Sequence, residues 1–399
     1  MKILLLTSRL PYPPHRGDKL KIYNLLKQLS TRHEITLLSF TASRSDAQYV
    51  PSLRNYCTEV ITIKLPVWHS LVNCLANIFS KTPFQVAYFF SRRMKRQVEI
   101  ELKRTSFDVV HVHLIRMAQY SLRNNPEIPR ILDLTDAGSV YLQRFLDTTR
   151  SPLQRLFLSE EVSRIKKYES VLEHFDKCLV CSDPDRQALL KNAPNARIDL
   201  LYNGVDLEYF TSNGVRSFDR SRIIFTGNMS YYPNRDGVAY FVKEIFPLIK
   251  RQDNDVKLFI VGKDPPPSIR HLSRDDITVT GFVPEIKEYY LQSAVAVAPV
   301  RFGAGTLNKV LEPMALGVPV VASPSSVEGL PVQHFRDLLI ADSPIEFANC
   351  VVELLRDRNL QGRLSENSKA IVRKLYDWKM VARQLESSYS DLHSNRLSP

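Results

Sequence analysis

The chain has 399 residues, of which 44% are hydrophobic and 24% charged, an ordinary globular composition that suits two α/β domains better than one. The first strand-like run, Met1–Leu6, is followed by prolines within a few residues, so its apolar stretch is too short for a signal peptide. Polar residues interrupt the apolar stretch Leu65–Phe90, which excludes a spanning helix there. Five cysteines, an odd number spread along the chain, favour a reducing compartment. We therefore expect a cytoplasmic protein, either free or peripheral on the inner face of the cytoplasmic membrane.

The net charge of +12 is concentrated in the first third of the chain, because residues 1–120 contain eighteen Lys and Arg against seven Asp and Glu. Such a local excess indicates an anionic partner: a membrane surface, a phosphorylated acceptor or nucleic acid. No zinc finger, recognition-helix pattern or RNA-binding signature accompanies it, so we do not expect nucleic acid. Basic and aromatic residues are mixed in Pro83–Arg104, which suits contact with an anionic membrane and equally an amphipathic helix packed on its own domain.

In the first half, apolar runs alternate with helical segments, which predicts a parallel sheet. The strand Lys2–Leu6 is followed by a Pro/Gly loop to Asp18, a helix that ends at Leu29, and the strand Glu34–Phe40. Further strands are expected at Val60–Ile63, Val109–Val112, Ile131–Leu134, Cys178–Cys181 and Arg197–Leu201. Residues Asn203–Asp206 then predict a turn, and the polar segment 211–221 is the best candidate for a linker.

After the linker the alternation restarts and predicts a second sheet. Its strands are expected at Ile223–Thr226, Val256–Val261, Ile277–Thr280, Val295–Pro299 and Pro319–Ala322, and its helices at Gly237–Lys250, Ile286–Gln292 and Asn308–Leu316. Gly or Pro lies at the strand ends, and the carboxyl ends of parallel strands open onto the ligand crevice. We therefore expect the ligand between the two halves.

The densest group of chemistry-bearing residues is the run PVRFGAGTLNKVLEPMALGVPVVAS at 299–323. Gly303 and Gly305 leave backbone amides unobstructed just before a helix, whose amino end favours anions. Arg301 and Lys309 add positive charge there. Glu312 lies one turn after Lys309, where a carboxylate can accept both hydroxyls of a ribose. The pattern predicts a nucleoside-diphosphate site, although a connecting turn with a solvated Lys–Glu pair has the same spacing.

This run resembles the donor-site signature of retaining GT-B glycosyltransferases of the group 1 or family 4 type, in which a Glu precedes Met-Ala, a Gly and Pro-Val-Val-Ala. The resemblance covers most of the chain, including the Gly/Pro loop after the first strand, the turn Asn203–Asp206, the glycines Gly227 and Gly262, and GFV at 281–283. The motif GNMSYYPN at 227–234 is closest to a branch of exopolysaccharide-associated bacterial sugar transferases.

The resemblance implies an α/β fold of the GT-B class, with two Rossmann-like domains facing across a cleft. Residues 1–205 would form the acceptor-side domain and residues 206–376 the donor-binding domain. The C-terminal helix, 377–399, would pack back on the first domain with Trp378 as its anchor.

Two positions depart from the family pattern. The family usually has two glutamates with seven residues between them, and the first would fall at Ala304. Asn228 replaces the Arg that usually follows the glycine of the second domain's first strand. We therefore assign the diphosphate to Arg301 and Lys309, and the ribose to Glu312.

Carried over residue by residue, the resemblance implies three groups of site residues. The catalytic group is His113, Arg301 and Lys309; the donor-binding group is Gly17, Asn228, Val283, Gly303, Ala304, Gly305, Thr306, Leu307 and Glu312; the acceptor-side group is Asp18, Lys19 and Asp136. For the first domain, plainer interpretations stay open. Gly17 also fits a turn feeding a helix, His113 a structural strand-end residue, and Asp133 with Asp136 a structural pair.

The sequence thus predicts a retaining glycosyltransferase that uses a UDP- or GDP-sugar. The expected acceptor is a lipid-linked, polysaccharide or other glycan in cell-envelope or exopolysaccharide biosynthesis. No Asp-x-Asp motif lies between apolar strands, so we expect no metal, and no cofactor is needed because the nucleotide sugar is a substrate. Two alternatives remain: a degenerate GT-B partner that binds the nucleotide sugar without transferring it, and a nucleotide-sugar epimerase of the same fold.

Overall fold

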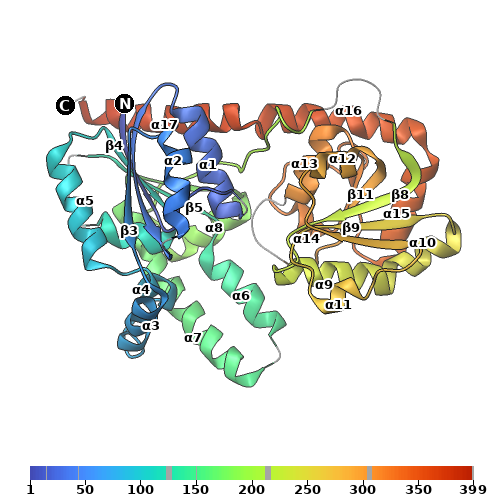
Figure 1. Cartoon of the computed structure of the whole chain (residues 1–399), viewed down its shortest axis with the longest axis horizontal. Helices are drawn as coiled ribbons and strands as arrows, with labels where there is room; N and C mark the ends of the chain where they lie inside the picture. Colours follow the sequence, from blue (N-terminus) through green and yellow to red (C-terminus); the bar gives the residue numbers. More distant parts are fainter. Residues whose placement is uncertain are drawn as a thin grey trace. The chain divides into compact units, whose positions relative to one another are not determined.

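The computed structural model describes residues 1–14, 16–43, 45–122, 128–149, 151–211, 217–302 and 308–397 (Figure 1). The chain divides into two compact units. Unit 1 consists of Met1–Asn203 with Trp378–Pro399, and unit 2 of Gly204–Asp377. Each unit is described by itself below.

The described strands of unit 1 form a seven-stranded parallel sheet in the order β3-β2-β1-β4-β5-β6-β7. They are β1 (Lys2–Thr7), β2 (Glu34–Thr41), β3 (Glu59–Lys64), β4 (Val109–His113), β5 (Arg130–Thr135), β6 (Lys177–Val180) and β7 (Ile198–Leu200). The helices are α1 (Gly17–Leu29), α2 (Val50–Arg54), α3 (Val67–Ala76), α4 (Phe84–Tyr88), α5 (Arg92–Arg104), α6 (Gly138–Thr148), α7 (Pro152–Tyr168), α8 (Asp183–Asn192) and α17 (Trp378–Leu397). All of the strands expected in this half are present.

Both faces of this sheet are covered, so its central strands are apolar throughout rather than alternating. Leu4 and Leu6 of β1 point into the cluster on the α5 side, together with Met94 and Val98. Ile3 and Leu5 point to the opposite face, into a cluster formed with α1 and α17. Successive residues of one strand therefore fill two separate cores.

The last helix, α17, belongs to the core of unit 1 and lies alongside α1 (Figure 1). Its buried residues recur at intervals of three and four, which places them on one helical face: Trp378, Val381, Ala382, Leu385, Tyr389 and Leu392. Beyond this face, Glu386 accepts hydrogen bonds from Arg32 at 2.7 and 2.9 Å and contacts His33 at 2.8 Å. The end of the chain therefore completes the face of the sheet that α1 covers.

The described strands of unit 2 form a six-stranded parallel sheet in the order β10-β9-β8-β11-β12-β13. They are β8 (Asp219–Thr226), β9 (Lys257–Val261), β10 (Ile277–Gly281), β11 (Ser293–Ala298), β12 (Val320–Ala322) and β13 (Leu339–Ile340). The helices are α9 (Tyr232–Tyr240), α10 (Phe246–Gln252), α11 (Pro267–Arg270), α12 (Ile286–Leu291), α13 (Asn308–Leu316), α14 (Pro324–Val327), α15 (Pro344–Arg356) and α16 (Arg358–Leu375). With both sheets in this order, the predicted α/β class of two Rossmann-like domains is confirmed.

One expected helix differs from its prediction, and the short strand β13 was not predicted. The helix expected over Gly237–Lys250 is two helices, α9 and α10, joined by a π-helical turn at Phe241–Ile245. Pro247 has no N–H to donate to the preceding turn, and the N–H of Phe246 bonds five residues back to Phe241. The proline therefore widens the helix instead of ending it.

In both units the strand order reverses beside the first strand. In unit 1, β1 pairs with β2 on one side and with β4 on the other. In unit 2, β8 pairs with β9 and β11 in the same way. Ligands of open parallel sheets bind at the carboxyl ends of the strands where the order reverses. This topology points to the loops after β1 and β4 in unit 1, and after β8 and β11 in unit 2.

If α17 is part of the core of unit 1, Leu385→Ala should lower the free energy of unfolding of that unit by about 2–5 kcal/mol, because Leu385 is fully buried. Met380, which is 43% exposed on the same helix, is the matched control, and Met380→Ala should change it by less than about 0.5 kcal/mol. Urea unfolding followed by tryptophan emission measures both, since Trp68 and Trp378 belong to unit 1. Equal effects of the two variants would contradict the packing.

Candidate active site

In unit 2, the ends of β8 and β9 come so close that only glycine fits. A Cβ on Gly262 would lie 1.8 Å from the carbonyl oxygen of Gly227. A Cβ on Gly227 would lie 2.6 Å from Nδ2 of Asn234, a residue in the first turns of α9. These two glycines therefore let Asn234 sit directly against the end of β8.

Lys309 of α13 is held by Asn234. The Nδ2 of Asn234 donates to the carbonyl oxygen of Asn228 at 2.8 Å, which leaves its Oδ1 to accept a hydrogen bond from the Nζ of Lys309. The ammonium group also lies 5.0 Å from the ring centroid of Phe225. Burial lowers the pKa of Lys309 to about 7, and Glu312 opposes this only in part. The lysine thus has a neutral hydrogen-bond partner and forms no ion pair with any residue of the described chain.

Glu312 lies one turn further along α13 and is reached by a chain of hydroxyl groups. The hydroxyl of Tyr290 donates to Oε2 of Glu312 at 3.1 Å and lies 2.6 Å from Oγ1 of Thr226 at the end of β8. Burial raises the pKa of Glu312 to about 7, although Tyr290 and Lys309 both act in the opposite direction. Burial also raises the pKa of Tyr290, so it stays a hydrogen-bond donor. Tyr290 therefore orients the carboxylate of Glu312 through Oε2, and Oε1 has no hydrogen bond to the described residues.

Three other described residues of unit 2 were predicted for the donor site: Arg301, Asn228 and Val283. Arg301 follows β11, is half exposed, and forms a two-point ion pair with Asp236 of α9 at 2.6 and 2.9 Å. Its guanidinium also lies over the ring of Tyr240. The side chain of Asn228 accepts hydrogen bonds from Ser230, so it is committed to its own loop. Val283 is half buried in the loop after β10. Five further predicted donor residues, Gly303, Ala304, Gly305, Thr306 and Leu307, lie outside the described residues.

In unit 1, a buried ion pair lies at the corresponding edge. Nζ of Lys21 donates to Oδ1 of Asp133 at 2.6 Å, and both side chains are at most 1% exposed. The register of β4 and β5 pairs His113 with Asp133, and Nδ1 of His113 lies 3.4 Å from the second oxygen of the carboxylate. Burial would raise the pKa of Asp133, but Lys21 and two histidines outweigh it and hold the pKa well below its usual value. The carboxylate is therefore ionised, and its second oxygen lies beside His113 in a contact that does not meet hydrogen-bond geometry.

His111, two residues before His113 in β4, also lies close to the carboxylate of Asp133. Its Nδ1 lies 2.5 Å from the hydroxyl of Tyr389 on α17, and its Nε2 lies 3.7 Å from Asp133. Burial lowers the pKa of His111, so it is neutral at pH 7. The network therefore connects α1, β4, β5 and α17, and His113 is its outermost strand-end member.

Charged groups surround the carboxyl ends of β1 and β4. Asp18 pairs with Arg9 at 3.1 Å and with Arg16 at 3.4 Å. Burial would raise its pKa, but these arginines outweigh burial and hold the pKa below its usual value. Arg116 has its pKa lowered to about 10 by burial and then by Arg9. Asp136 has its pKa raised to about 6 by burial and by the neighbouring Asp185.

Gly17 and Lys19, the other residues predicted for unit 1, begin α1. A Cβ on Gly17 would meet no atom within 4 Å, so packing does not require a glycine there. Burial lowers the pKa of Lys19, although Asp46 and Asp18 act against it. The structure thus places Gly17, Asp18, Lys19, His113 and Asp136 at one edge of the sheet in unit 1.

Two residues with strained backbone lie at this edge. Leu114, directly after His113, has φ of 72°, and Thr135, directly before Asp136, has φ of 69°. Positive φ costs free energy in residues other than glycine, most of all in β-branched residues such as threonine. Such strain is often found at functional sites, which supports a role for the two neighbouring side chains.

Sequence reasoning missed several members of both networks. Lys21 and Arg116 were not singled out, nor were Asn234 and Tyr290 as partners of Lys309 and Glu312. For Lys21 a signal existed: it is a lysine among the apolar positions of an amphipathic helix, and buried lysines require a partner. The contact of Tyr389 with His111 joins positions 278 residues apart, and local spacing gives no sign of it.

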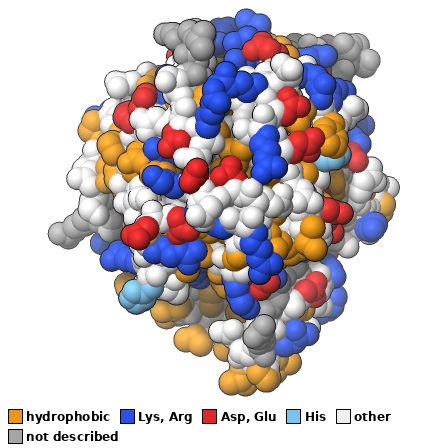
Figure 2. Space-filling model, turned by 90° about the vertical axis from the view of Figure 1, so that its right-hand side faces the viewer, with side chains coloured by type: hydrophobic (Ala, Val, Ile, Leu, Met, Phe, Trp, Pro, Cys, Tyr) orange, Lys and Arg blue, Asp and Glu red, His pale blue; other side chains and the backbone are white. Residues whose placement is uncertain are grey.

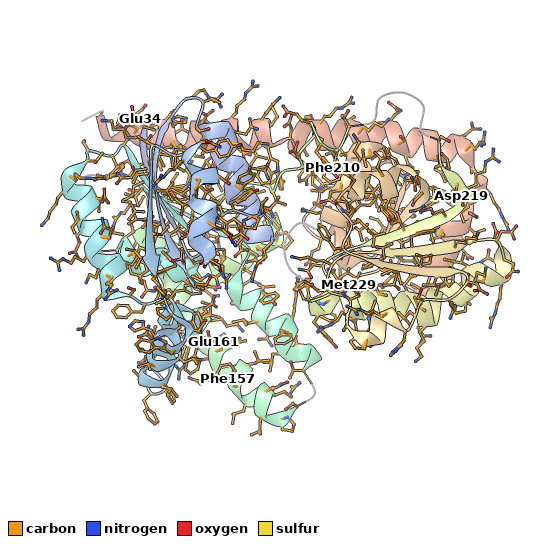
Figure 3. The ribbon with its side chains drawn as sticks, viewed as in Figure 1. Glu34, Phe157, Glu161, Phe210, Asp219 and Met229 are labelled. Atoms are coloured by element: carbon orange, nitrogen blue, oxygen red, sulfur yellow. The ribbon has the colours of Figure 1, made fainter. Side chains whose placement is uncertain are left out.

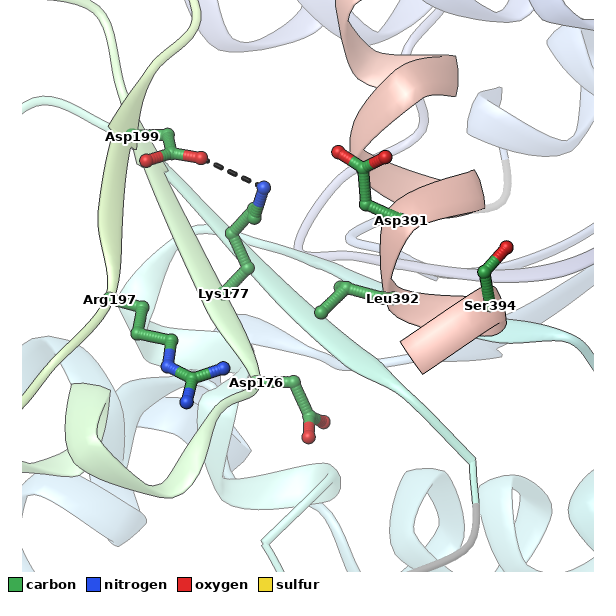
Figure 4. A pocket seen from close by; sticks show the side chains of 7 residues that line it. All are labelled: Asp176, Lys177, Arg197, Asp199, Asp391, Leu392 and Ser394. Carbon is green, nitrogen blue, oxygen red and sulfur yellow. Dashed lines mark ion pairs between the residues drawn. The ribbon is translucent and has the colours of Figure 1, made fainter. Parts of the chain in front are cut away.

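A polar cavity of about 670 Å³ lies elsewhere in unit 1 (Figure 4). It is lined by Asp176, Lys177, Arg197, Asp199, Asp391, Leu392 and Ser394, and Lys177 pairs with Asp199 at 2.8 Å. Lys177 begins β6 and Arg197 precedes β7, so the cavity is at the amino ends of the strands. It therefore lies at the opposite edge of the sheet from the candidate site.

Two family models match consecutive parts of the chain. The model described as Glycosyltransferase Family 4 matches residues 22–209, and the model described as Glycosyl transferases group 1 matches residues 220–357. The chain belongs to this family of glycosyltransferases. Its two Rossmann-like sheets are those of the GT-B fold, as the resemblance implied.

Relatives and solved structures of similar length agree with this. The chain is 21% identical to an "Uncharacterized 44.6 kDa protein in cps region" of Klebsiella pneumoniae, over 95% of this chain and 97% of the relative. It is 22% identical to spore coat protein SA of Bacillus subtilis, over 98% and 99%. A sucrose-phosphate synthase of Thermosynechococcus elongatus has a TM-score of 0.69 at 18% identity, with 99% and 100% covered. Anabaena HepE in complex with UDP and glucose has a TM-score of 0.64 at 15% identity, with 98% and 100% covered.

If the Lys21–Asp133 pair supports the glycosyltransferase's first domain, Asp133→Asn should lower the free energy of unfolding of unit 1 by about 3–5 kcal/mol, because it leaves a buried ammonium group uncompensated. The matched control is Asp199→Asn, which breaks the pair with Lys177 at a carboxylate that is 53% exposed and should cost less than about 1 kcal/mol. Urea unfolding of the variants measures both. A loss below about 1 kcal/mol for Asp133→Asn would contradict a structural role for the pair.

Proposed function

We propose that the protein transfers a sugar, with retention, from a UDP- or GDP-sugar to a lipid-linked, polysaccharide or other glycan acceptor in cell-envelope or exopolysaccharide biosynthesis. The observation that carries the proposal is the pair Lys309 and Glu312 on α13. The buried ammonium group of Lys309 has a neutral hydrogen-bond partner, and one oxygen of the Glu312 carboxylate accepts a hydrogen bond from Tyr290. The two residues lie one helical turn apart, at the edge where the strand order reverses.

Lys309 suits the diphosphate of a donor. An ammonium group in apolar surroundings binds an anion more strongly than it would in water, because the local dielectric is low. Its lowered pKa means that an approaching diphosphate would also shift the lysine to its charged form. As the bond to the sugar breaks, negative charge grows on the leaving diphosphate, and a charge fixed in advance stabilises that transition state.

Arg301 would supply a second positive group. Its Nε and Nη2 are used by Asp236, which leaves Nη1 without a hydrogen bond to the described residues. Asp236 compensates part of its charge, so Lys309 would act on the diphosphate more strongly than Arg301. Glu312 would accept the ribose hydroxyls, which requires its ionised form.

In unit 1, His113 would contact the transferred sugar. The carboxylate of Asp133 lies beside Nδ1 of His113, so Nε2 would be the nitrogen that contacts a hydroxyl of the sugar. Asp18, Lys19 and Asp136 would contact the acceptor from the same edge. The name of the Klebsiella relative, a protein in a cps region, supports a polysaccharide or its precursor as acceptor, and the HepE complexes with UDP and with UDP-glucose support a uridine nucleotide as donor.

Calorimetry with UDP, GDP, ADP and dTDP, each with magnesium and with EDTA, tests the donor class. We expect selective binding of UDP or GDP that does not require the metal. Binding of none of the four would contradict the proposed donor site.

Turnover tests transfer itself. The protein is incubated with the selected nucleotide sugar and with polyprenyl-diphosphate-linked sugars, and the products are followed by mass spectrometry. The proposal predicts nucleoside diphosphate together with an acceptor heavier by one sugar. A donor that is bound but unchanged would indicate a degenerate binding partner, and an isomerised sugar still attached to the nucleotide would indicate an epimerase.

If Lys309 neutralises the diphosphate, Lys309→Met should weaken binding of the selected nucleoside diphosphate by about 10- to 100-fold, the loss of a hydrogen bond to a charged group. Lys243, which is 83% exposed in the same unit, is the matched control, and Lys243→Met should leave the affinity unchanged. Calorimetry measures both variants. Equal affinities of Lys309→Met and the parent protein would exclude this role.

A further inference from the structure

Helix α3 in unit 1 carries its apolar residues on the outside. Six of them are at least half exposed: Val67, Trp68, Leu71, Val72, Leu75 and Phe79, which follows the helix. Phe79 is 102% exposed, so no described residue shields it. Soluble proteins rarely expose a contiguous apolar surface of this kind unless it meets a partner.

The polar side of the same helix faces the protein. Ser70 is fully buried, and Nδ2 of Asn73 donates to the carbonyl oxygen of Phe90 at 2.9 Å. At the end of α3, Arg164 of α7 donates to the carbonyl oxygens of Asn77 at 3.0 Å and of Ile78 at 2.5 Å. Specific polar contacts therefore fix α3 with its apolar face outwards, the reverse of a helix packed on a core.

The apolar surface continues onto α7. Phe157 is 54% exposed and its ring stacks on that of Phe84 of α4 at 5.2 Å. Leu153 and Leu156 precede it with exposures of 81% and 72%. Figure 3 labels Phe157 and Glu161 on α7, and Glu161 accepts hydrogen bonds from the backbone of Phe84 and Gln85. In the space-filling view, orange side chains gather at the lower end, at the height where Figure 1 draws α3 and α7 (Figure 2).

Basic residues flank this surface, and acidic residues are absent from its segment. Between Val60 and Val98 the sequence contains no Asp or Glu, and it contains Lys64, Lys81, Arg92, Arg93, Lys95 and Arg96. Lys64 ends the strand before α3, and Lys81 lies two residues after Phe79. Arg92 and Arg93 begin α5 directly after Phe90, which Asn73 contacts. Cations therefore lie on both sides of the apolar face of α3 along the chain.

The structure also shows which apolar residues near the basic segment are exposed. Within Pro83–Arg104, where the sequence mixes aromatic and basic residues, Val86, Phe89 and Met94 are buried in the core of unit 1. That stretch offers cations, and its apolar residues Phe90 and Ile100, at 39% and 44%, are less exposed than those of α3. None of the helices in the described ranges is long and apolar enough to span a bilayer.

We propose that the apolar face of α3, with the flanking lysines and arginines, docks on the surface of an anionic lipid bilayer. Aliphatic and aromatic side chains would enter the boundary between headgroups and acyl chains, and the cations would pair with acidic headgroups. Pairing of this face with a second copy would bring two segments of the same positive charge together, which opposes such a dimer. The inference is independent of the donor site, and its test needs no turnover.

Tryptophan emission gives a direct test, because the chain has two tryptophans in different surroundings. Trp68 is 66% exposed on α3, and Trp378 is 3% exposed in the core. With vesicles of phosphatidylcholine and phosphatidylglycerol, we expect a blue shift and protection from acrylamide, but neither with phosphatidylcholine alone. Trp68→Phe should abolish the change. No change with the anionic vesicles, or the same change in Trp68→Phe, would overturn the proposal.

Flotation with the same anionic vesicles tests the two components separately. The double variant Leu71→Gln/Leu75→Gln should bind at least about tenfold more weakly, because it removes apolar surface from the inserted face. Arg92→Gln/Arg93→Gln should weaken binding and reduce its salt dependence. Ile345→Gln, a change at a residue 65% exposed in unit 2, is the matched control and should bind as the parent protein does.

Two controls distinguish lipid binding from misfolding of the variant and from self-association. The free energy of unfolding of the Leu71/Leu75 variant in urea, followed by tryptophan emission, should match that of the parent protein, which shows that unit 1 of the variant is folded. Sedimentation velocity without lipid should show a monomer at all concentrations. A concentration-dependent dimer that the Leu71/Leu75 variant loses would overturn the proposal in favour of a second copy as the occupant.

Discussion

A buried ammonium group needs a compensating negative charge, and the two buried lysines of the described chain meet this need in different ways. Lys21 has a buried carboxylate, Asp133, at 2.6 Å, and the pair stays charged inside unit 1. Lys309 has no carboxylate in ion-pair contact among the described residues; it donates to the amide oxygen of Asn234 and lies over the ring of Phe225, and burial lowers its pKa to about 7. The fold therefore supplies a charged partner for Lys21 but only a neutral one for Lys309, which is why we propose that a ligand brings the anion.

The topology explains why both lysines occupy comparable positions. Each sheet reverses its strand order beside its first strand, and the loops at that edge carry the polar residues. In unit 1 the edge is filled by Asp133, its histidines and the charged groups around Asp18. In unit 2 the glycines at the ends of β8 and β9 admit Asn234, which positions Lys309. The same topology therefore holds a charge-compensated network in unit 1 and, in unit 2, a buried lysine with a neutral partner, where we propose that an anion binds.

Much of the fold could be predicted from the sequence, since short apolar runs ending in Gly or Pro are strong signals of a parallel sheet. The two-residue strand β13 was missed because it is too short to show a pattern, and Pro247 was not expected to produce a π turn. Lys309 and Glu312 were found because helical spacing relates them. Their partners Asn234 and Tyr290 come from other helices, and only the fold brings them near.

The outward apolar face of α3 could not be foreseen, because periodicity gives the two faces of a helix but not which one is covered.

The central claim is that Lys309 becomes charged when a nucleoside diphosphate binds, and proton uptake measures this directly. Calorimetry at about pH 8 in two buffers of different ionisation enthalpy reports the protons exchanged on binding. At that pH Lys309 is largely neutral and Glu312 largely ionised, since both have pKa values of about 7. We predict uptake of a proton by the parent protein and none by Lys309→Met. Binding without uptake, or equal uptake by the variant, would contradict the account.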